Sequence, residues 1–295
     1  MKETILVTGS EGFIGRALTQ TLTEAGHDVW GLDVAVRPET RRLAVDLLDA
    51  AATAAAVARI PPCGVVIHLA ALAHGQAPPV GETCFTLNTR TTANLLQALT
   101  ATVPRLILFS SIAVYGEDGH RDPVKPGDAL RPATAYGASK QACEEQALAS
   151  PLPHVEILRL APVFTAERLH DVKKRVFLPG LPFRWRFLPP PSYSLCHLDT
   201  VVSTVRARVG RGPRGRSVQN VADAQPYSQH ALVEWFAGPV LPLPVGLTRP
   251  GYAALRLLPG HLGHGLRSLY WKLLCSNTYD LEEVTLPPGS ARQSA

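Results

Sequence analysis

The hydrophobic residues of this chain fall into short runs separated by longer segments of mixed polarity. Runs rich in valine, isoleucine and leucine predict strands that are buried on both faces of a parallel sheet. Such runs cover residues 4–8, 28–33, 43–47, 65–71, 105–109, 155–160 and 217–221. The segments between them predict helices at residues 16–25, 49–59, 88–101 and 228–236, and around Tyr136. Strands alternate with helices, which predicts an α/β fold built on a doubly wound parallel sheet.

A smaller C-terminal lobe is expected beside the predicted sheet. Residues 165–216 are basic and proline-rich, unlike the segments before them. We therefore expect residues 1–164 and 217–237 to form the domain that contains the sheet, and residues 165–216 and 238–295 to form the lobe. Leucines and basic residues at 252–274 are typical of a membrane-surface helix, but Pro259 and Gly260 interrupt them and favour short helices packed on the lobe. Residues 287–295 are expected to be a frayed tail.

Three glycines follow the first predicted strand and precede the first predicted helix. Gly9, Gly12 and Gly15 lack side chains, so backbone amides at the start of the helix can approach a diphosphate closely. The second strand ends in Asp33, at the spacing where a carboxylate holds the ribose hydroxyls of NAD. Arg37, Arg41 and Arg42 follow, so NADP remains an alternative. We therefore expect a sheet of the Rossmann type, in which residues 1–164 and 217–237 form a dinucleotide-binding domain and the C-terminal lobe binds the substrate.

Composition and charge restrict the partners and the location. The formal charge is +5, but the arginines form no run interleaved with aromatic residues, which disfavours nucleic acid. Five cysteines show no metal-ligand spacing, so we expect reduced thiols, no metal and a cytoplasmic protein. The first residues do not resemble a secretory signal, and no stretch is long and apolar enough to span a bilayer.

Tyr136 and Lys140 are the candidate chemical centre. Residues four apart on a helix share a face, so the Lys140 ammonium is expected to lie near the Tyr136 phenol and to lower its pKa. Ser111 falls at the carboxyl end of a predicted strand, where sheets of this kind bind their ligands. We expect Tyr136 to transfer a proton near neutral pH.

These motifs together resemble those of the extended short-chain dehydrogenase/reductase family, the NAD-dependent epimerase/dehydratase group that acts on nucleotide sugars. The resemblance covers most of the chain, including residues 8–15, 114–116, 197–199 and 220–228. It implies a catalytic triad of Ser111, Tyr136 and Lys140, in which Lys140 also holds the nicotinamide ribose. The implied cofactor-binding residues are Gly9, Gly12, Phe13, Ile14, Gly15, Asp33, Asp46, Leu47, Leu69, Ala70, Ala71, Asn88, Tyr136 and Lys140.

The residues after Ser111 narrow the reaction. Dehydratases of this family carry an Asp-Glu pair where this chain has Ile112 and Ala113, so a dehydratase is disfavoured. A second group, the epimerase-reductases, carries a cysteine directly after the serine. This chain has Ile112 at that position, which cannot transfer a proton. Two activities remain, a 4-epimerase and a 4-ketoreductase, and the motifs most resemble reductases of UDP-4-keto-6-deoxy-N-acetylhexosamine in surface-polysaccharide pathways. The implied substrate is a nucleotide sugar, UDP-linked.

Some positions depart from the family pattern. Epimerases often carry a diphosphate-binding arginine where this chain has Tyr193. Arg184 and Arg186 are the candidate replacements for that arginine. The candidate substrate-binding residues are therefore Ser111, Arg184 and Arg186. A homodimer is implied by the resemblance. An alternative from another class is an NAD(P)-binding regulatory or assembly protein without turnover, which has no need of the triad.

Overall fold

The structure, a computed structural model, describes residues 2–36, 40–72, 78, 82–99, 103–117, 123–177, 181–244, 270–271 and 273–286. Arg37, most of the 252–274 segment and the expected tail at 287–295 lie outside these ranges. Within the described ranges, no helix has the length and hydropathy of a membrane span.

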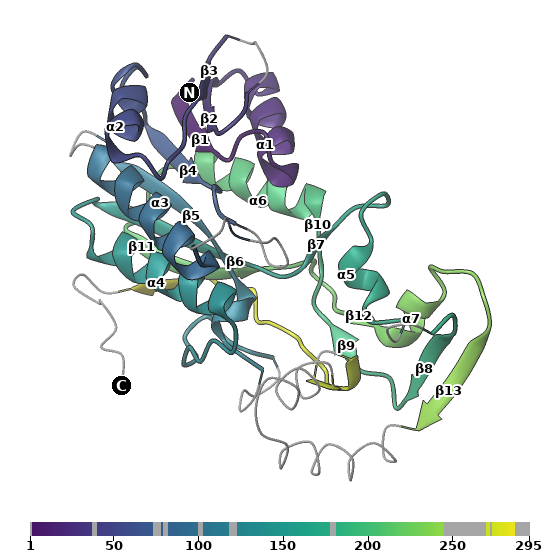
Figure 1. Cartoon of the computed structure of the whole chain (residues 1–295). Helices are drawn as coiled ribbons and strands as arrows, with labels where there is room; N and C mark the ends of the chain where they lie inside the picture. Colours follow the sequence, from purple (N-terminus) through teal and green to yellow (C-terminus); the bar gives the residue numbers. More distant parts are fainter. Residues whose placement is uncertain are drawn as a thin grey trace.

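An eight-stranded sheet is the centre of the fold and confirms the predicted class (Figure 1). Its strand order is β14-β11-β6-β5-β4-β1-β2-β3. Every neighbouring pair is parallel except β11 with β14. The strands are β1 (Thr4–Thr8), β2 (Asp28–Asp33), β3 (Arg42–Ala44), β4 (Val65–His68), β5 (Arg105–Ser111), β6 (His154–Leu160), β11 (Arg216–Val221) and β14 (Val284–Leu286).

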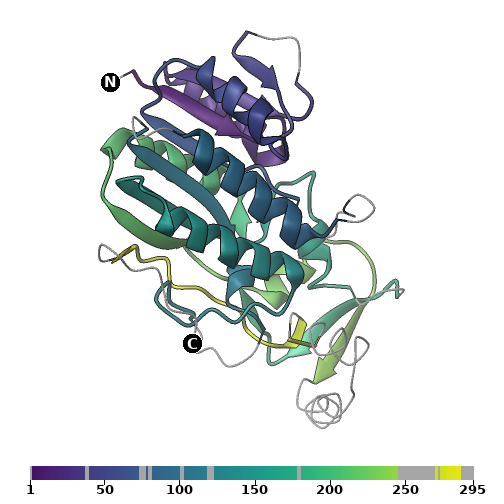
Figure 2. The same ribbon diagram turned by 60° about the vertical axis from the view of Figure 1, so that its left-hand side comes forward.

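Helices cover both faces of the sheet, which makes it doubly wound (Figures 1 and 2). One face packs against α1 (Phe13–Glu24) and α6 (Leu198–Arg211) through residues such as Leu18 and Val205. The other face packs against α2 (Ala50–Ala58), α3 (Cys84–Ala98) and α4 (Ala135–Ala149). Side chains of both layers are buried against the strands, so nearly all residues of the central strands β1, β4, β5 and β6 are buried.

A smaller group of elements lies beyond the carboxyl ends of the strands (Figure 1). It has its own buried cluster, which includes Phe164, Val176 and Leu232. The elements are η1 (Ile112–Val114), β7 (Val163–Phe164), α5 (His170–Lys173), β8 (Arg184–Leu188), β9 (Ser192–Tyr193), β10 (Cys196–His197), β12 (Tyr227–Ser228), α7 (Gln229–Val233) and β13 (Val240–Pro244). Helix α6 and strand β14, which the sequence division assigns to the lobe, lie instead on and in the main sheet.

Two element bounds differ from the expectation in ways that affect the site. Helix α3 begins at Cys84, because Thr83 and Thr86 cap each other's backbone amides at 3.1 and 3.0 Å. Strand β5 continues to Ser111, which pairs with Leu160 of β6. The position of Ser111 is therefore set by the ladder between two central strands.

His68 is a packed strand residue, as expected, and its burial makes the fold sensitive to acid. Its ring nitrogens bond the hydroxyls of Thr8 and Thr92 at 2.7 and 3.1 Å. Burial, and then the charge of Lys140, lower the pKa of His68 to about 3.

Acid should therefore destabilise the protein through His68. The folded pKa lies below the unfolded value of about 6.5, so this stability is complete above pH 6.5 and is lost as the pH falls toward 3. In urea unfolding, the wild type should lose stability more steeply than His68→Gln between pH 6.5 and 4.5. Parallel losses in the two proteins would contradict the assignment.

Candidate active site

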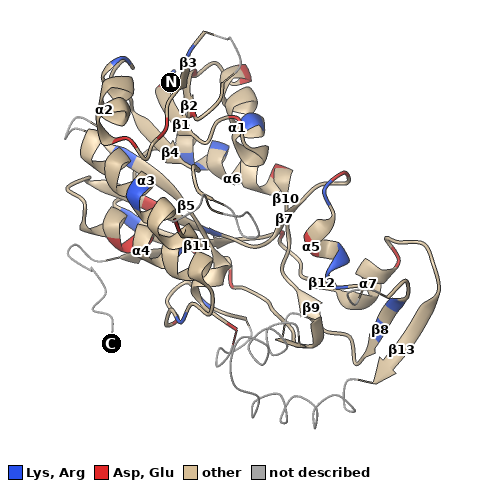
Figure 3. Ribbon diagram, viewed as in Figure 1, with Lys and Arg blue, Asp and Glu red and all other residues tan. Residues whose placement is uncertain are grey.

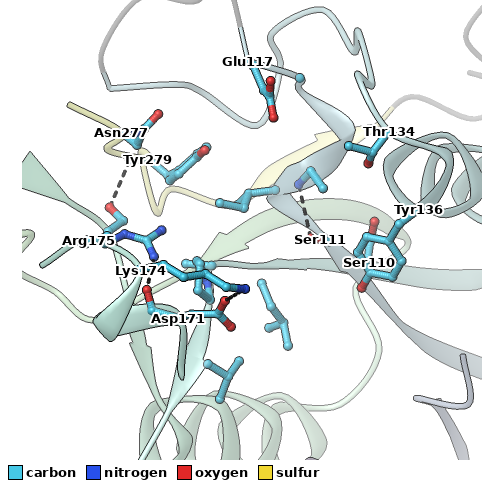
Figure 4. A pocket seen from close by; sticks show the side chains of 18 of the residues that line it. Ser110, Ser111, Glu117, Thr134, Tyr136, Asp171, Lys174, Arg175, Asn277 and Tyr279 are labelled. Atoms are coloured by element: carbon cyan, nitrogen blue, oxygen red, sulfur yellow. Dashed lines mark hydrogen bonds and ion pairs between the residues drawn. The ribbon is translucent and has the colours of Figure 1, made fainter. Parts of the chain in front are cut away.

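A cavity of about 620 Å³ opens at the carboxyl ends of β5 and β6, between the sheet and the lobe. Its walls come from the start of α1, from η1, from the start of α4, from α5 with the residues after it, and from residues 271–279. Figure 4 shows side chains from these segments converging on one space. The volume is within the range of small-molecule sites.

Ser111 and Tyr136 meet at one wall of this cavity. Tyr136 lies in the first turn of α4, whose N-cap, Thr134, accepts a hydrogen bond from the Gly137 amide at 3.0 Å. The Ser111 hydroxyl lies close enough to the Tyr136 phenol to favour its ionised form, and Ser111 Oγ accepts from the Ala113 amide at 3.2 Å. The strand end and the helix start thus place the two hydroxyls together.

Lys140 is buried behind this wall. Its Nζ donates to the Phe109 carbonyl at 2.9 Å and lies 6.0 Å from the centroid of the Tyr136 ring. Burial lowers the pKa of Lys140, since the ammonium has left water. The structure brings Ser111, Tyr136 and Lys140 together, as the resemblance implies.

The expected lowering of the Tyr136 pKa is wrong for this structure. Burial raises the pKa of Tyr136 to about 12, and the Ser111 hydroxyl offsets only part of the increase. The Lys140 ammonium is directed at a carbonyl oxygen rather than at the phenol. Tyr136 is therefore a neutral phenol at pH 7, the form that donates a proton.

The glycine turn fits the diphosphate of a dinucleotide. A Cβ at Gly15 would lie 2.0 Å from the Gly9 carbonyl oxygen, and Gly9 itself has a φ of +69°. Gly12 is the N-cap of α1, and no side chain caps that helix. Phe13 and Ile14 follow Gly12 and line the cavity. The turn offers bare backbone amides at a helix start, which is what an oxyanion binds.

Asp33 lies beside this turn, as expected of a ribose-binding acid. Its carboxylate accepts from the amides of Glu11 and Val34, both at 2.8 Å. Arg41 pairs with Asp28 at 2.5 Å, and Arg42 donates to the Val29 carbonyl at 3.1 Å. Both arginines are held near the first half of β2, whereas Asp33 ends the strand.

The other predicted cofactor residues occupy the same edge of the sheet. Asp46 is exposed, and neighbouring Leu47 is buried with its carbonyl accepting from Asn94 at 2.8 Å. Leu69, Ala70 and Ala71 directly follow β4, with the Ala70 amide donating to Thr8 Oγ1 at 3.3 Å. All three residues are partly exposed, and the Ala70 backbone packs so closely on the turn that a Cβ at Gly9 would lie 2.9 Å from its amide nitrogen.

Asn88 braces this edge rather than facing the cavity. It is buried, and its amide group exchanges hydrogen bonds with the Leu72 backbone at 2.7 and 3.2 Å. It also donates to Ser139 Oγ at 3.0 Å. Asn88 thereby ties the segment after β4 to the helix that carries Tyr136.

Replacing Gly15 with alanine should abolish dinucleotide binding. The new Cβ would meet the Gly9 carbonyl at 2.0 Å, so the turn must shift. A matched control is Gly210→Ala in helix α6, because a Cβ there meets nothing within 4 Å and the backbone is helical. Titration with NAD should show no saturable binding for Gly15→Ala, whereas Gly210→Ala should keep the wild-type Kd. Wild-type affinity in Gly15→Ala would place the diphosphate elsewhere.

Arg184 and Arg186, predicted to bind substrate, do not line the cavity. The Arg184 guanidinium donates to backbone carbonyls near α7, including that of Val233 at 2.8 Å. Arg186 forms an ion pair with Glu234 on the surface. Both lie on β8, which pairs with β13 and not with the main sheet, so neither side chain reaches the cavity.

Other basic residues occupy the wall that those two arginines were expected to form. Arg168, Lys174 and Arg175 line the cavity, together with Asp171; Figure 3 shows the positive charge on α5 as well as on β8. Tyr193 is fully buried with its hydroxyl bonded to the Leu273 carbonyl. The basic run at 173–175 is visible in the sequence, but only the packing of α5 shows which of its members face the cavity. In the described ranges, no group of three His, Cys, Asp or Glu side chains could hold a metal.

The fold and the site together are those of a dinucleotide-dependent α/β protein. They combine a parallel sheet, a glycine turn at a helix start with Asp33 beside it, and Ser111 and Tyr136 at one cavity. The family model for the NAD dependent epimerase/dehydratase family matches residues 5–176. That is more than half of the chain, so the chain belongs to this family. The cofactor of the family is NAD, in agreement with the prediction from Asp33.

Two curated relatives share part of the sequence. D-erythronate dehydrogenase of Cupriavidus necator is 33% identical over 159 residues, covering 46% of this chain and 47% of the relative. UDP-glucose 4-epimerase of Vibrio cholerae is 34% identical over 157 residues, covering 50% and 47%. The matched part thus spans about half the length of each relative.

A solved structure extends the likeness of the fold over nearly the whole chain. The Bordetella bronchiseptica enzyme WbmG, in complex with NAD and UDP, superposes with a TM-score of 0.68 at 20% identity. The match covers 95% of this chain and 86% of that one. At this identity the likeness concerns the fold alone.

Proposed function

We propose that this chain is an NAD-dependent oxidoreductase of a nucleotide sugar that acts at the C4 hydroxyl or ketone. The observation that carries the proposal is that Ser111 and Tyr136 lie close together at the wall of the cavity. The UDP-glucose 4-epimerase relative supports the substrate class. Two activities satisfy this site, 4-ketoreduction and 4-epimerisation.

The residues of the chain supply the proton chemistry. When bound, NADH would supply the hydride to the sugar carbon and NAD+ would accept it. In the direction of reduction, the neutral Tyr136 phenol donates its proton to the ketone oxygen, and Ser111 donates a hydrogen bond to the same oxygen. Lys140, buried behind the phenol, would hold the nicotinamide ribose, the other role that the resemblance implies.

The two residues after Ser111 disfavour a third activity. Eliminating water from a sugar requires a separate acid and base beside the reacting carbon. Ile112 and Ala113 both line the cavity and neither can exchange a proton. These side chains support hydride transfer without elimination.

The test begins with the purified protein and its bound dinucleotide, released by denaturation. NADH and NADPH absorbance is then followed with a panel of UDP-4-keto sugars and UDP-sugars. Consumption of reduced cofactor supports the ketoreductase, and exchange of C4 epimers without consumption supports the epimerase. Bound dinucleotide with neither activity would favour the regulatory alternative and reject the enzyme. A homodimer, a cytoplasmic location and a role in surface-polysaccharide synthesis stay predictions.

A further inference from the structure

We propose that Arg175 binds an oxyanion of the substrate, at the end of the cavity away from Tyr136. The proposal rests on the proposed function for the identity of the reacting end, but the anion site stands on its own contacts. Figure 4 shows Arg175, Lys174 and Asp171 on one side of the cavity and Tyr136 on the other. A ligand that spans the space would place its reacting oxygen and its charge at opposite ends.

The guanidinium of Arg175 is held in place by uncharged groups. Its centre lies 5.2 Å from the centroid of the Tyr193 ring, and that ring is fully buried. One terminal nitrogen, Nη1, donates to the backbone carbonyl of Asp171 at 2.6 Å. The Tyr193 ring and the Asp171 carbonyl fix the orientation of the Arg175 guanidinium, and neither group neutralises its positive charge.

Arg175 has no ion-pair partner among the described residues. None of their carboxylates lies within ion-pair distance of its guanidinium, and its buried Nε has no acceptor. By contrast, the three fully buried arginines, on β5, β6 and α6, are all paired: Arg159 with Glu144 at 2.6 Å, and Arg105 and Arg208 with Glu156. Arg184 and Arg216 are partly buried like Arg175, and both of their terminal nitrogens bond backbone carbonyls, whereas Arg175 bonds a single carbonyl. Burial lowers the pKa of Arg175, the cost expected for a cation without a counterion.

The nearby acid offsets this charge only in part. Asp171 forms its ion pair with Lys174 at 3.0 Å, and despite its partial burial the contacts with Lys174, and then the charge of Arg175, lower the pKa of the carboxyl. A further cation, Arg168, lies over the Phe13 ring at 4.6 Å and has no ion pair among the described residues. The wall therefore keeps a net positive charge at neutral pH.

A planar guanidinium fork binds two oxygens of a phosphate or a carboxylate. Two substrate classes offer such a group: the diphosphate of a nucleotide sugar and the carboxylate of a sugar acid. The relatives include enzymes named for each class, UDP-glucose 4-epimerase and D-erythronate dehydrogenase. Both classes offer an oxyanion. A comparison of probes from the two classes shows which one depends on Arg175 for binding.

Calorimetric titration of the NAD-loaded protein tests this site with UDP, uridine and D-gluconate. Arg175→Gln should weaken UDP binding about 10- to 100-fold, the cost of a charged hydrogen-bond pair. Uridine, which lacks phosphate, should bind both proteins equally. The matched control is Arg186→Gln, because Arg186 is 39% exposed and outside the cavity; it should change UDP affinity less than about twofold. Arg175→Lys keeps the charge without the fork and should lose less affinity than Arg175→Gln.

Stability separates a binding role from a structural one. Removing an uncompensated cation from a site should leave the Tm and the NAD affinity unchanged or raise the Tm. A lower Tm with unchanged UDP binding in Arg175→Gln or Arg175→Lys would overturn the proposal, as would equal UDP loss in Arg186→Gln. If D-gluconate rather than UDP depends on Arg175, the anion site holds and the nucleotide-sugar function fails. Wild-type protein that binds neither probe would reject the site.

Discussion

Tyr136→Phe should lower kcat by about 10²- to 10⁴-fold while leaving the Kd for NAD within about twofold of the wild type. The substitution removes one oxygen, the only atom of the side chain that can exchange a proton with the substrate. The ring remains, so the cavity and the start of α4 keep their shape. Rates with a UDP-4-keto sugar and reduced cofactor, together with a separate NAD titration, measure the two effects independently.

Tyr227→Phe is the matched control for this result. Tyr227 also carries a partly buried phenol with a raised pKa, and its hydroxyl donates to Asp223 at 2.7 Å. It does not line the cavity, so its kcat should be that of the wild type. Near-normal turnover in Tyr136→Phe, or an equal loss in Tyr227→Phe, would remove Tyr136 from the mechanism.

The second large effect is expected from Arg159→Met, which should lower the free energy of unfolding by about 3–5 kcal/mol. Arg159 donates to both carboxylate oxygens of Glu144, at 2.9 and 2.6 Å, and also to the Tyr115 hydroxyl at 2.9 Å. Glu144 is 2% exposed, so without the arginine its negative charge stays buried and unpaired. Urea unfolding at pH 7 measures the loss.

Two further variants identify the cause of that loss. Arg186→Met, which breaks the exposed ion pair with Glu234, should lower the free energy of unfolding by only about 0–1 kcal/mol. Adding Glu144→Gln to Arg159→Met should recover part of the stability, because the uncompensated charge is gone. If the double variant is no more stable than Arg159→Met, the loss comes from packing rather than from charge.

Local patterns predict much of this fold and of its catalytic wall. The glycine turn, Asp33, Ser111 and Tyr136 each lie at a strand end or a helix start, and parallel strands bring such ends to one edge. Their grouping needs only the order of elements, which the hydrophobic runs reveal. The same runs predict the doubly wound sheet, because each buried strand is followed by a helical segment.

What the sequence could not predict depends on contacts between distant segments. The pKa of Tyr136 is raised mainly by burial in the folded chain, and Lys140, one turn along, is directed at the Phe109 carbonyl instead of the phenol. Arg175 and Arg184 both belong to basic clusters, and only the packing of α5 and β8 places one at the cavity and the other against backbone carbonyls. Strand β14 joins the main sheet by pairing with β11, more than sixty positions earlier.

The segment at 271–286 both walls the cavity, through Asn277 and Tyr279, and completes the sheet through β14. On the ribosome, all the strands from β1 to β6 and the whole glycine turn emerge before this segment is made. The sheet and the cavity therefore both stay incomplete until synthesis is nearly finished: the sheet lacks its edge strand β14, and the cavity lacks the wall that Asn277 and Tyr279 form.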